Sequence, residues 1–345
     1  MYESFFGLTG KPFQLNPDPS FYFGSRGHKR AFAYLEYGLY QSEGFIVITG
    51  EIGAGKTTIV RSLLEQLDPE KVVAVQLVST QLDADDMLRA VGAAFGIPVK
   101  SVDKAMLLAS LEAFLCQLAV QKKRALLIVD EAQNLTPRAI EELRMLSNFQ
   151  LGDQALLQSF LVGQPELRAM MQGEQMQQLR QRVIASYHLG PLDKPETRAY
   201  IEHRLKHVDW NGDPQFDPAC FDLIHTLTSG IPRRINTLCN RLLLAAFLAE
   251  RHVLETADVQ AIAHEIRDEL GPDAALSAVS VVDCDAVPPS SPLMARLEAG
   301  RLHAHFDNVE ERIDRLEKTV AAAVDLLHRL LHPEKTAKPG TPAKR

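Results

Sequence analysis

FIVITGEIGAGKTT, residues 45–58, is the stretch that decides the fold of this 345-residue chain. An apolar run (45–49) leads into GEIGAGKT (50–57), which matches the pattern GxxxxGK[ST], and a helical pattern follows it. In that pattern a loop between a buried strand and a helix curls its backbone N–H groups around phosphate oxygens, at the positive end of the helix dipole. Because both the strand and the helix are in place, we predict a phosphate-binding P-loop rather than a chance match.

The residues of the P-loop are expected to share the binding of ATP and Mg²⁺. Lys56 would reach the terminal phosphates, and the hydroxyl of Thr57 would ligate the metal ion. The glycines let the loop curl tightly enough for its backbone to contact the phosphates. The remaining residues expected to bind the nucleotide through this loop are Gly50, Glu51, Ile52, Gly53, Ala54, Gly55 and Thr58.

LLIVDEAQ, residues 126–133, is the predicted second half of the site. Its four apolar residues form a buried strand that delivers Asp130 to the strand's carboxyl end, where a carboxylate can hold Mg²⁺ and its water shell. Glu131 follows directly and is the candidate to polarise the attacking water. Two adjacent acids at a strand end are also common in solvated loops. Because the same chain carries a P-loop upstream of these two acids, we favour the catalytic interpretation.

Five apolar runs of strand length alternate with longer helical patterns, which predicts an α/β fold with a five-stranded parallel sheet covered on both faces. Polar residues gather just past the carboxyl ends of these strands, where such sheets bind ligands. The runs are FIVIT (45–49), VVAVQLV (72–78), ALLIV (125–129), LLQSFLVG (156–163) and ASYHL (185–189).

Two weaker signals lie near the last two strands. Gln164 closes the fourth strand and is expected to sense the γ-phosphate or to orient water, unless it only satisfies a turn. Arg180 and Arg182 precede the fifth strand, where an arginine can project toward a neighbouring subunit's nucleotide and stabilise developing charge. Either could be a surface charge instead, and Arg182 is the favoured candidate.

SGIPRRIN, residues 229–236, carries the last candidate. It places Arg233 in the first turn of a helix that begins at Pro232. An arginine on a mobile helical lid can contact the phosphates and report the state of the nucleotide. Arg234 faces another way and is interpreted as structural.

The chain is predicted to contain six segments. After the sheet region only helical periodicity remains, then a stretch rich in Pro, Ser and Ala, and then roughly four heptads with apolar residues at both core positions. A single amphipathic helix docked on its own chain is the alternative to a coiled coil. The segments are an N-terminal arm (1–27), a nucleotide-binding α/β domain (28–192), a helical lid domain (193–270), a flexible linker (271–292), a coiled coil (293–332) and a disordered basic tail (333–345).

Composition narrows the class of protein. The net charge of -7 argues against wholesale nucleic-acid binding, although a local basic patch would be compatible with it. The four cysteines form no CxxC pair and are interpreted as reduced core residues of a cytosolic protein. We find neither a signal peptide nor an apolar run long enough to span a bilayer. His203 and His207 lie four residues apart, but no third zinc ligand is evident, so a solvated helix face is the better interpretation.

Taken as one ordered set, the P-loop (Walker A), the acidic strand end (Walker B), the strand-end glutamine, the arginine before the fifth strand and the lid arginine resemble the AAA+ ATPases. Within them, the chain looks similar over about residues 1–270 to the general secretion pathway protein A family, and most of all to the putative secretion ATPase found with exosortase and exopolysaccharide gene clusters. The stretches that carry this resemblance are FFGLTGKPFQLNPDPSFYF (5–23), HKRAFAYLEYGL (28–39), VDEAQNL (129–135), LVGQPEL (161–167) and LRQRV (179–183).

The resemblance implies a sheet domain with a helical lid, nucleotide bound between them, and assembly into a ring or a smaller homo-oligomer. It implies that Gln164 is the first sensor, Arg182 the finger and Arg233 the second sensor. His28 falls in a segment that lies near the adenine in such proteins, and a packing role is an equal alternative. Relatives often continue into a membrane span and a peptidoglycan-binding domain, whereas this sequence continues into the linker and the heptads, which puts direct cell-wall remodelling in doubt.

The leading hypothesis is therefore a cytoplasmic AAA+ ATPase, peripheral at the inner membrane through partners, that assembles or regulates an envelope secretion or exopolysaccharide export system. Water oriented by Glu131 would attack ATP in line, with charge neutralised by Lys56, Mg²⁺ and a neighbour's arginine. A DNA-associated ATPase of the transposition or replication type is the alternative from another class. A nucleotide-gated scaffold that hydrolyses ATP slowly or not at all is the third.

Overall fold

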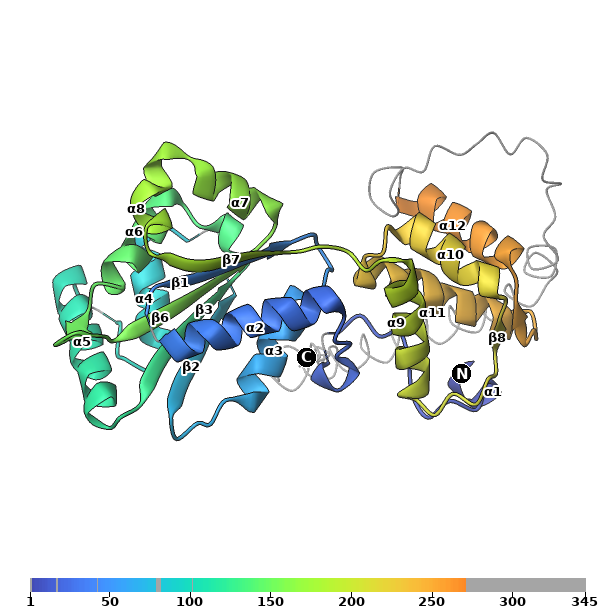
Figure 1. The fold of residues 1–345 in the computed structure, drawn as a ribbon, viewed down its shortest axis with the longest axis horizontal. Helices are drawn as coiled ribbons and strands as arrows, with labels where there is room; N and C mark the ends of the chain where they lie inside the picture. The colour runs from blue at the N-terminus through green and yellow to red at the C-terminus, as the bar shows by residue number, and fades with distance from the viewer. Residues whose placement is uncertain (1, 17, 42, 79–81, 101, 271–345) are drawn as a thin grey trace, which may run out of the picture. The chain divides into compact units, whose positions relative to one another are not determined.

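The computed structural model describes residues 2–270 except 17, 42, 79–81 and 101 (Figure 1). All of them lie in one compact unit. The predicted linker, coiled coil and basic tail lie outside the described residues.

The five predicted strands all form, and they build one parallel sheet. They are β1 (Phe45–Gly50), β2 (Val72–Val78), β3 (Arg124–Asp130), β6 (Leu157–Gly163) and β7 (Val183–Leu189), in the order β2-β3-β6-β1-β7. The strand that precedes the P-loop therefore lies between β6 and β7, and β6 separates it from β3. Since all strands run the same way, the P-loop, the acidic pair and Gln164 leave the sheet at one edge.

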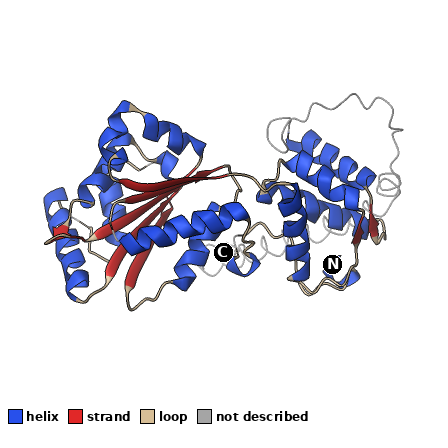
Figure 2. Ribbon diagram, viewed as in Figure 1, coloured by secondary structure: helices blue, strands red, loops and turns tan. Residues whose placement is uncertain are grey.

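Helices cover both faces of the sheet, as the continuous apolar runs predict (Figure 2). Successive residues of β3 show the two faces: Leu126 and Ile128 pack in one core, and Leu127 and Val129 pack in the other. The first core includes residues of α2 (Arg26–Gln41) and α3 (Lys56–Gln66). The second core includes residues of α4 (Ala84–Ala94), α5 (Lys104–Val120) and α6 (Pro137–Leu146).

Short elements connect β3 to β7. They are η2 (Ala132–Asn134), the hairpin strands β4 (Gln150–Leu151) and β5 (Gln154–Ala155), α7 (Pro165–Gln172), η3 (Glu174–Met176) and α8 (Gln177–Arg180). The hairpin was not predicted from the sequence, because strands of two residues show no periodicity.

Four helices follow the sheet: α9 (Lys194–Lys206), α10 (Pro218–Thr228), α11 (Pro232–Leu248) and α12 (Thr256–Leu270). Asp193 caps α9 and Asp217 caps α10, each through its side chain, and a proline stands in the first turn of both helices. The sequence predicted helices alone here, but β8 (Gln215–Phe216) and β9 (Val253–Leu254) form a short parallel pair. The boundary between a nucleotide-binding domain and a lid domain stays a prediction.

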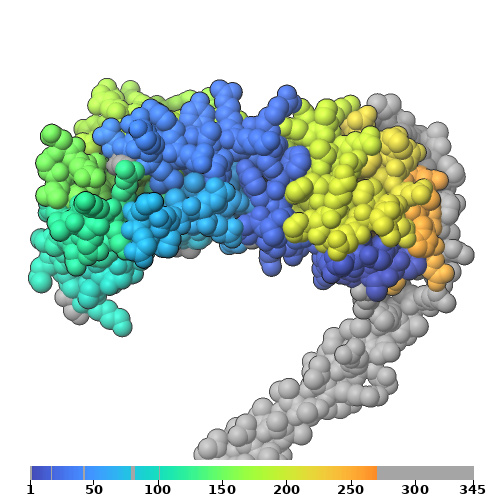
Figure 3. All heavy atoms as spheres, turned by 60° about the horizontal axis from the view of Figure 1, so that its bottom comes forward, coloured from blue at the N-terminus to red at the C-terminus, as the bar shows by residue number. Residues whose placement is uncertain are grey.

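The N-terminal arm contains α1 (Tyr2–Phe5) and η1 (Pro19–Phe21), and it contacts α9 and α11 (Figure 3). The buried guanidinium of Arg204 in α9 holds the arm: its Nε donates to the carbonyl of Pro12 at 2.5 Å and its Nη2 to the carbonyl of Gln14 at 3.4 Å. The same group lies 4.7 Å from the ring centroid of Phe21. Among the described helices, none is both long and apolar enough to cross a membrane.

Candidate functional site

The P-loop joins β1 to α3 through two glycines in the left-handed region of the backbone. Gly53 has φ +82° and Gly55 has φ +100°, conformations that residues with a Cβ rarely adopt. Gly55 is also the N-cap of α3, where it offers no side chain to the first N–H groups of the helix. Those donors, together with the positive end of the helix dipole, therefore point to a place that suits an anion.

Lys56 is buried at the centre of this loop, with 6% of its surface exposed. Its Nζ donates to the carbonyl of Gly50 at 2.7 Å and to that of Glu51 at 2.9 Å. Burial lowers the pKa of Lys56, and the nearby charges of Glu131 and Asp130 partly offset that effect. The ammonium group is thus held inside the loop's curve and beside the two acids that the sequence predicted as its partners.

Asp130 and Thr57 meet between the end of β3 and the start of α3. The hydroxyl of Thr57 donates to Oδ2 of Asp130 at 2.9 Å, and Asp130 is only 3% exposed. Burial raises the pKa of Asp130, because the hydrogen bond from Thr57 does not fully compensate for the loss of water. A buried carboxylate beside a hydroxyl is a set of hard oxygen donors, so the pair fits Mg²⁺.

Glu131 lies next to this pair and is held by two side-chain amides. Nε2 of Gln164 donates to its Oε2 at 2.8 Å, and Nε2 of Gln133 donates to the same oxygen at 2.5 Å. Burial raises the pKa of Glu131, but these two hydrogen bonds and the charge of Lys56 outweigh it, so the net shift is downward. Its backbone has φ +54°, an uncommon conformation for a residue with a side chain.

Gln133 is a site residue that the sequence reasoning missed. It belongs to the quoted DEAQ stretch, but no spacing rule assigns a role to the second residue after the acidic pair. In the structure the turn η2 begins just after Glu131, and within it Gln133 donates to the carboxylate of Glu131.

Arg233 also lies against the P-loop. Its backbone N–H donates to the carbonyl of Gly53 at 3.1 Å, and a Cβ added to Gly53 would overlap the Cβ of Arg233. The start of α11 is therefore in contact with the loop, as the lid prediction requires, and the side chain of Arg233 is exposed. The role of its guanidinium on phosphate stays a prediction.

His28 lies against the other side of the loop. Its Nε2 is 2.6 Å from where a Cβ on Gly55 would stand, and its Nδ1 is 2.7 Å from the hydroxyl of Ser25. Burial lowers the pKa of His28 to about 4, so the ring is neutral near pH 7. In this position the ring packs against the loop, as the packing alternative describes, and a contact with adenine stays a prediction.

The two finger candidates lie apart from this cluster. Nη1 of Arg182 donates to Oγ of Ser147 at 3.0 Å and to its carbonyl at 3.3 Å, just after α6. Nη1 of Arg180 donates to the carbonyls of Met171 at 2.5 Å and Gly173 at 2.6 Å. Both guanidinium groups are therefore used within their own chain.

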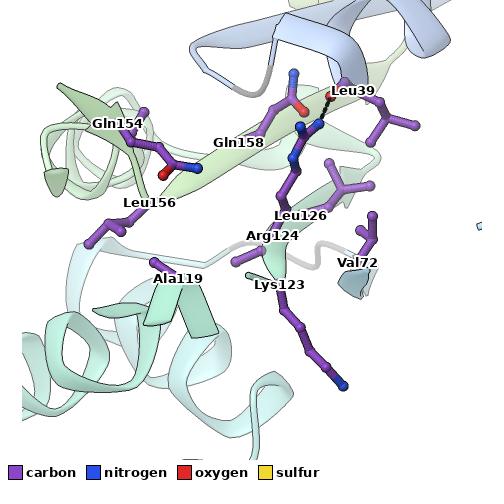
Figure 4. Close-up of a pocket in the computed structure, with 11 residues that line it drawn as sticks. Leu39, Val72, Ala119, Lys123, Arg124, Leu126, Gln154, Leu156 and Gln158 are labelled. Carbon is purple, nitrogen blue, oxygen red and sulfur yellow. Dashed lines mark hydrogen bonds between the residues drawn. The ribbon is translucent and has the colours of Figure 1, made fainter. Parts of the chain in front are cut away.

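Two other places do not belong to the site. The rings of His203 and His207 lie 6.5 Å apart, and within the part of the chain that the structure describes no three His, Cys, Asp or Glu residues group as metal ligands. A pocket lies beside the amino ends of β2, β3 and β6, where Arg124 donates to the carbonyl of Leu39 at 2.9 Å (Figure 4). Because the P-loop follows the carboxyl end of β1, this pocket is at the opposite edge of the sheet.

The comparisons with known proteins agree with this geometry. Residues 39–171 match the family described as an AAA domain. The general secretion pathway protein A of Aeromonas hydrophila is 40% identical over 274 residues, which are 78% of this chain and 50% of that protein. The chain thus spans about half the length of this relative.

Solved structures show the same fold at low sequence identity. The ORC2 protein of Aeropyrum pernix, in ADPNP and ADP complexes, has a TM-score of 0.55 at 19% identity, over 74% of this chain and 71% of that chain. Cdc6p from Pyrobaculum aerophilum has a TM-score of 0.55 at 16% identity, over 76% of this chain and 70% of that chain. The AAA-type α/β prediction is therefore confirmed, and the domain match supports the prediction of an ATP hydrolase.

Proposed function

Because this chain contains an AAA domain, we propose that it is a Mg²⁺-dependent ATP hydrolase that uses nucleotide-driven changes to assemble or regulate an envelope secretion or exopolysaccharide export system. The observation that carries the enzymatic part is the convergence of three groups at one edge of the sheet. Lys56 lies in the P-loop after β1, the Thr57–Asp130 pair lies at the end of β3, and Gln164 meets Glu131 at the end of β6. Together they supply a cation that can bind phosphate, ligands for Mg²⁺ and a base.

The residues of the site then have separate roles. Lys56 would leave the loop carbonyls and neutralise charge on the terminal phosphates. Thr57 and Asp130 would hold Mg²⁺, which when bound neutralises charge on the phosphate oxygens. Glu131 would accept a hydrogen bond from the attacking water and orient it in line with the bond to the leaving phosphate. Gln164, hydrogen-bonded to Glu131, would sense the terminal phosphate or help to orient the water.

Arg233 in the lid and Arg182 as the finger are the residues proposed to respond to the state of the nucleotide. The contact between Arg233 and Gly53 links the start of α11 to the loop, so a change in the loop on hydrolysis would move the helices that follow. Arg182 is bonded to Ser147 in the single chain, and it would have to exchange those bonds for a neighbouring subunit's nucleotide. Breaking these hydrogen bonds costs free energy, which a site completed between subunits, in a ring or a smaller homo-oligomer, would have to offset.

The pathway part of the proposal rests on the relative from Aeromonas hydrophila, whose name links it to secretion. Since the chain spans half of that protein, its partners are inferred only as envelope secretion or polysaccharide export proteins. We also propose that the chain lies in the cytoplasm, peripheral at the inner membrane through those partners. The net charge of -7 weighs against the DNA-associated alternative.

The proposal is tested by ATP binding and hydrolysis in the native chain and in three variants. Lys56→Ala is expected to lose nucleotide binding or turnover, whereas Lys71→Ala, at a side chain 77% exposed, is expected to behave like the native chain. ATP binding without turnover in the native chain would instead support the third hypothesis, a nucleotide-gated scaffold. The rate per protomer should also rise with protein concentration and fall in Arg182→Ala, and a rate indifferent to both would remove the finger assignment.

A further inference from the structure

The side chain of Gln133 connects three parts of the site. Its Nε2 donates to Oε2 of Glu131 at 2.5 Å, and its Oε1 accepts the backbone N–H of Gln164 at 2.9 Å. The side chain of Gln164 donates to the same Oε2 of Glu131 at 2.8 Å. These three bonds form a closed link between the end of β3 and the end of β6.

The amide of Gln133 also packs against the backbone at the end of β6. A Cβ added to Gly163 would stand 2.8 Å from Oε1 of Gln133, so the amide lies directly against the backbone at the end of β6. Glu131 has φ +54°, an uncommon backbone conformation that the neighbouring contacts must hold in place. Gln133 is therefore seated where it can fix both the strand end and the carboxylate.

The pattern of bonds also distinguishes the two oxygens of Glu131. Both amides donate to Oε2, so Oε1 is the oxygen left to accept a hydrogen bond from water. Placing a catalytic carboxylate to within a fraction of an ångström matters, because a misplaced base loses the alignment that in-line attack needs.

We propose that Gln133 is a positioning residue: it holds the carboxylate of Glu131 with one oxygen toward the attacking water and couples it to Gln164. This inference rests on the proposed ATP hydrolysis. A shift of Gln164 toward a terminal phosphate moves its backbone N–H, and the bond to Oε1 of Gln133 passes that shift to Glu131. Gln133 touches neither substrate nor metal in this role and acts only through its two partners.

The test compares Gln133→Ala and Gln133→Glu with the native chain and with Gln66→Ala, an exposed glutamine in α3. Gln133→Ala is expected to lower kcat about tenfold, as misplacement removes part of the contribution of a positioned base. ATP affinity, measured with a fluorescent nucleotide, should stay within about twofold, since no phosphate contact is lost. Gln133→Glu keeps the acceptor for the Gln164 N–H but replaces the donor to Glu131, so it should lose at least as much kcat.

A second arm separates positioning from a general structural role. In a Glu131→Gln background, single-turnover rates with and without Gln133→Ala should differ by less than about twofold, because the group through which Gln133 acts is already gone. A further tenfold loss in that background, a native rate in Gln133→Glu, or loss of ATP binding in Gln133→Ala would each overturn the proposal. Absence of hydrolysis in the native chain would instead overturn the proposed function itself.

Discussion

Replacing Gly53 with alanine adds one methyl group at the contact between the P-loop and α11. Gly53 has φ +82°, and its added Cβ would overlap the Cβ of Arg233 and lie 3.1 Å from its Cδ. The backbone N–H of Arg233 donates to the Gly53 carbonyl at 3.1 Å, so the two backbones cannot separate without loss of that bond. The substitution therefore probes whether the loop and the start of α11 are in the contact described.

The cost has two parts. A residue with a Cβ in the left-handed region costs about 1–2 kcal/mol. Overpacking of a close contact costs about 1–3 kcal/mol, which includes any weakening of the Arg233–Gly53 hydrogen bond. We therefore expect Gly53→Ala to lower the free energy of unfolding by about 2–5 kcal/mol.

Gly96→Ala is the matched control, because Gly96 has φ +79° but nothing within 4 Å of an added Cβ. It carries the backbone cost alone, about 1–2 kcal/mol. Urea unfolding followed by far-ultraviolet circular dichroism measures both variants in the same buffer. Equal destabilisation of the two variants would refute the contact between the loop and α11, and with it the structural basis for the lid. Gly53→Ala combined with Arg233→Gly should recover the contact part of the loss.

Three further predictions concern Arg204, His28 and Thr57. Arg204→Ala should lower the free energy of unfolding by about 3–5 kcal/mol, because buried carbonyls of the arm lose a charged donor. Arg198→Ala is the control: its side chain is 55% exposed, and its loss should cost under about 1 kcal/mol. Similar urea midpoints for the two variants would contradict this prediction. Burial lowers the pKa of His28 to about 4 in the folded chain. As the pH falls, His28 is therefore protonated in the unfolded chain before it is protonated in the folded chain, which favours unfolding. The protein should lose up to about 3 kcal/mol of stability between about pH 6.5 and pH 4. His28→Gln should lose less over that range, and an unchanged pH dependence of unfolding would show that the ring is not buried. Thr57→Val removes the hydroxyl bonded to Asp130 and should raise the Mg²⁺ concentration for half-maximal hydrolysis about tenfold, with Thr57→Ser close to native; an unchanged Mg²⁺ titration would remove Thr57 from the metal site.

The sheet could be predicted from the sequence because its signals are local. Each buried strand is a continuous apolar run, and the P-loop pattern demands a strand before it and a helix after it. The start of α11 at Pro232 was predicted for the same reason, since proline suits the first turn of a helix. The two-residue pairs β4–β5 and β8–β9 were missed, because strands of two residues show no periodicity, and β8 and β9 also lie far apart in the sequence.

The same difference between local patterns and tertiary contacts applies to the residues of the site. Residues that a loop motif or a strand end places together, such as Lys56 and Asp130, were predicted from their spacing. The link that Gln133 makes to Gln164 joins residues 31 apart in the chain, so only the order of β3 beside β6 reveals it. The bonds that Arg182 makes within its own chain are likewise a tertiary result, and the sequence could not distinguish them from a free guanidinium.

ATP turnover by Glu131→Gln tests the proposed role of Glu131 in hydrolysis. It is measured beside the native chain, with Glu65→Gln, at an exposed acid in α3, as control. ATP binding and Mg²⁺-dependent phosphate release are measured on the same preparations. If Glu131 orients the attacking water, the variant binds ATP as the native chain does but barely releases phosphate, while the control retains the native rate. Undiminished phosphate release by Glu131→Gln would contradict this role and remove Glu131 from the mechanism.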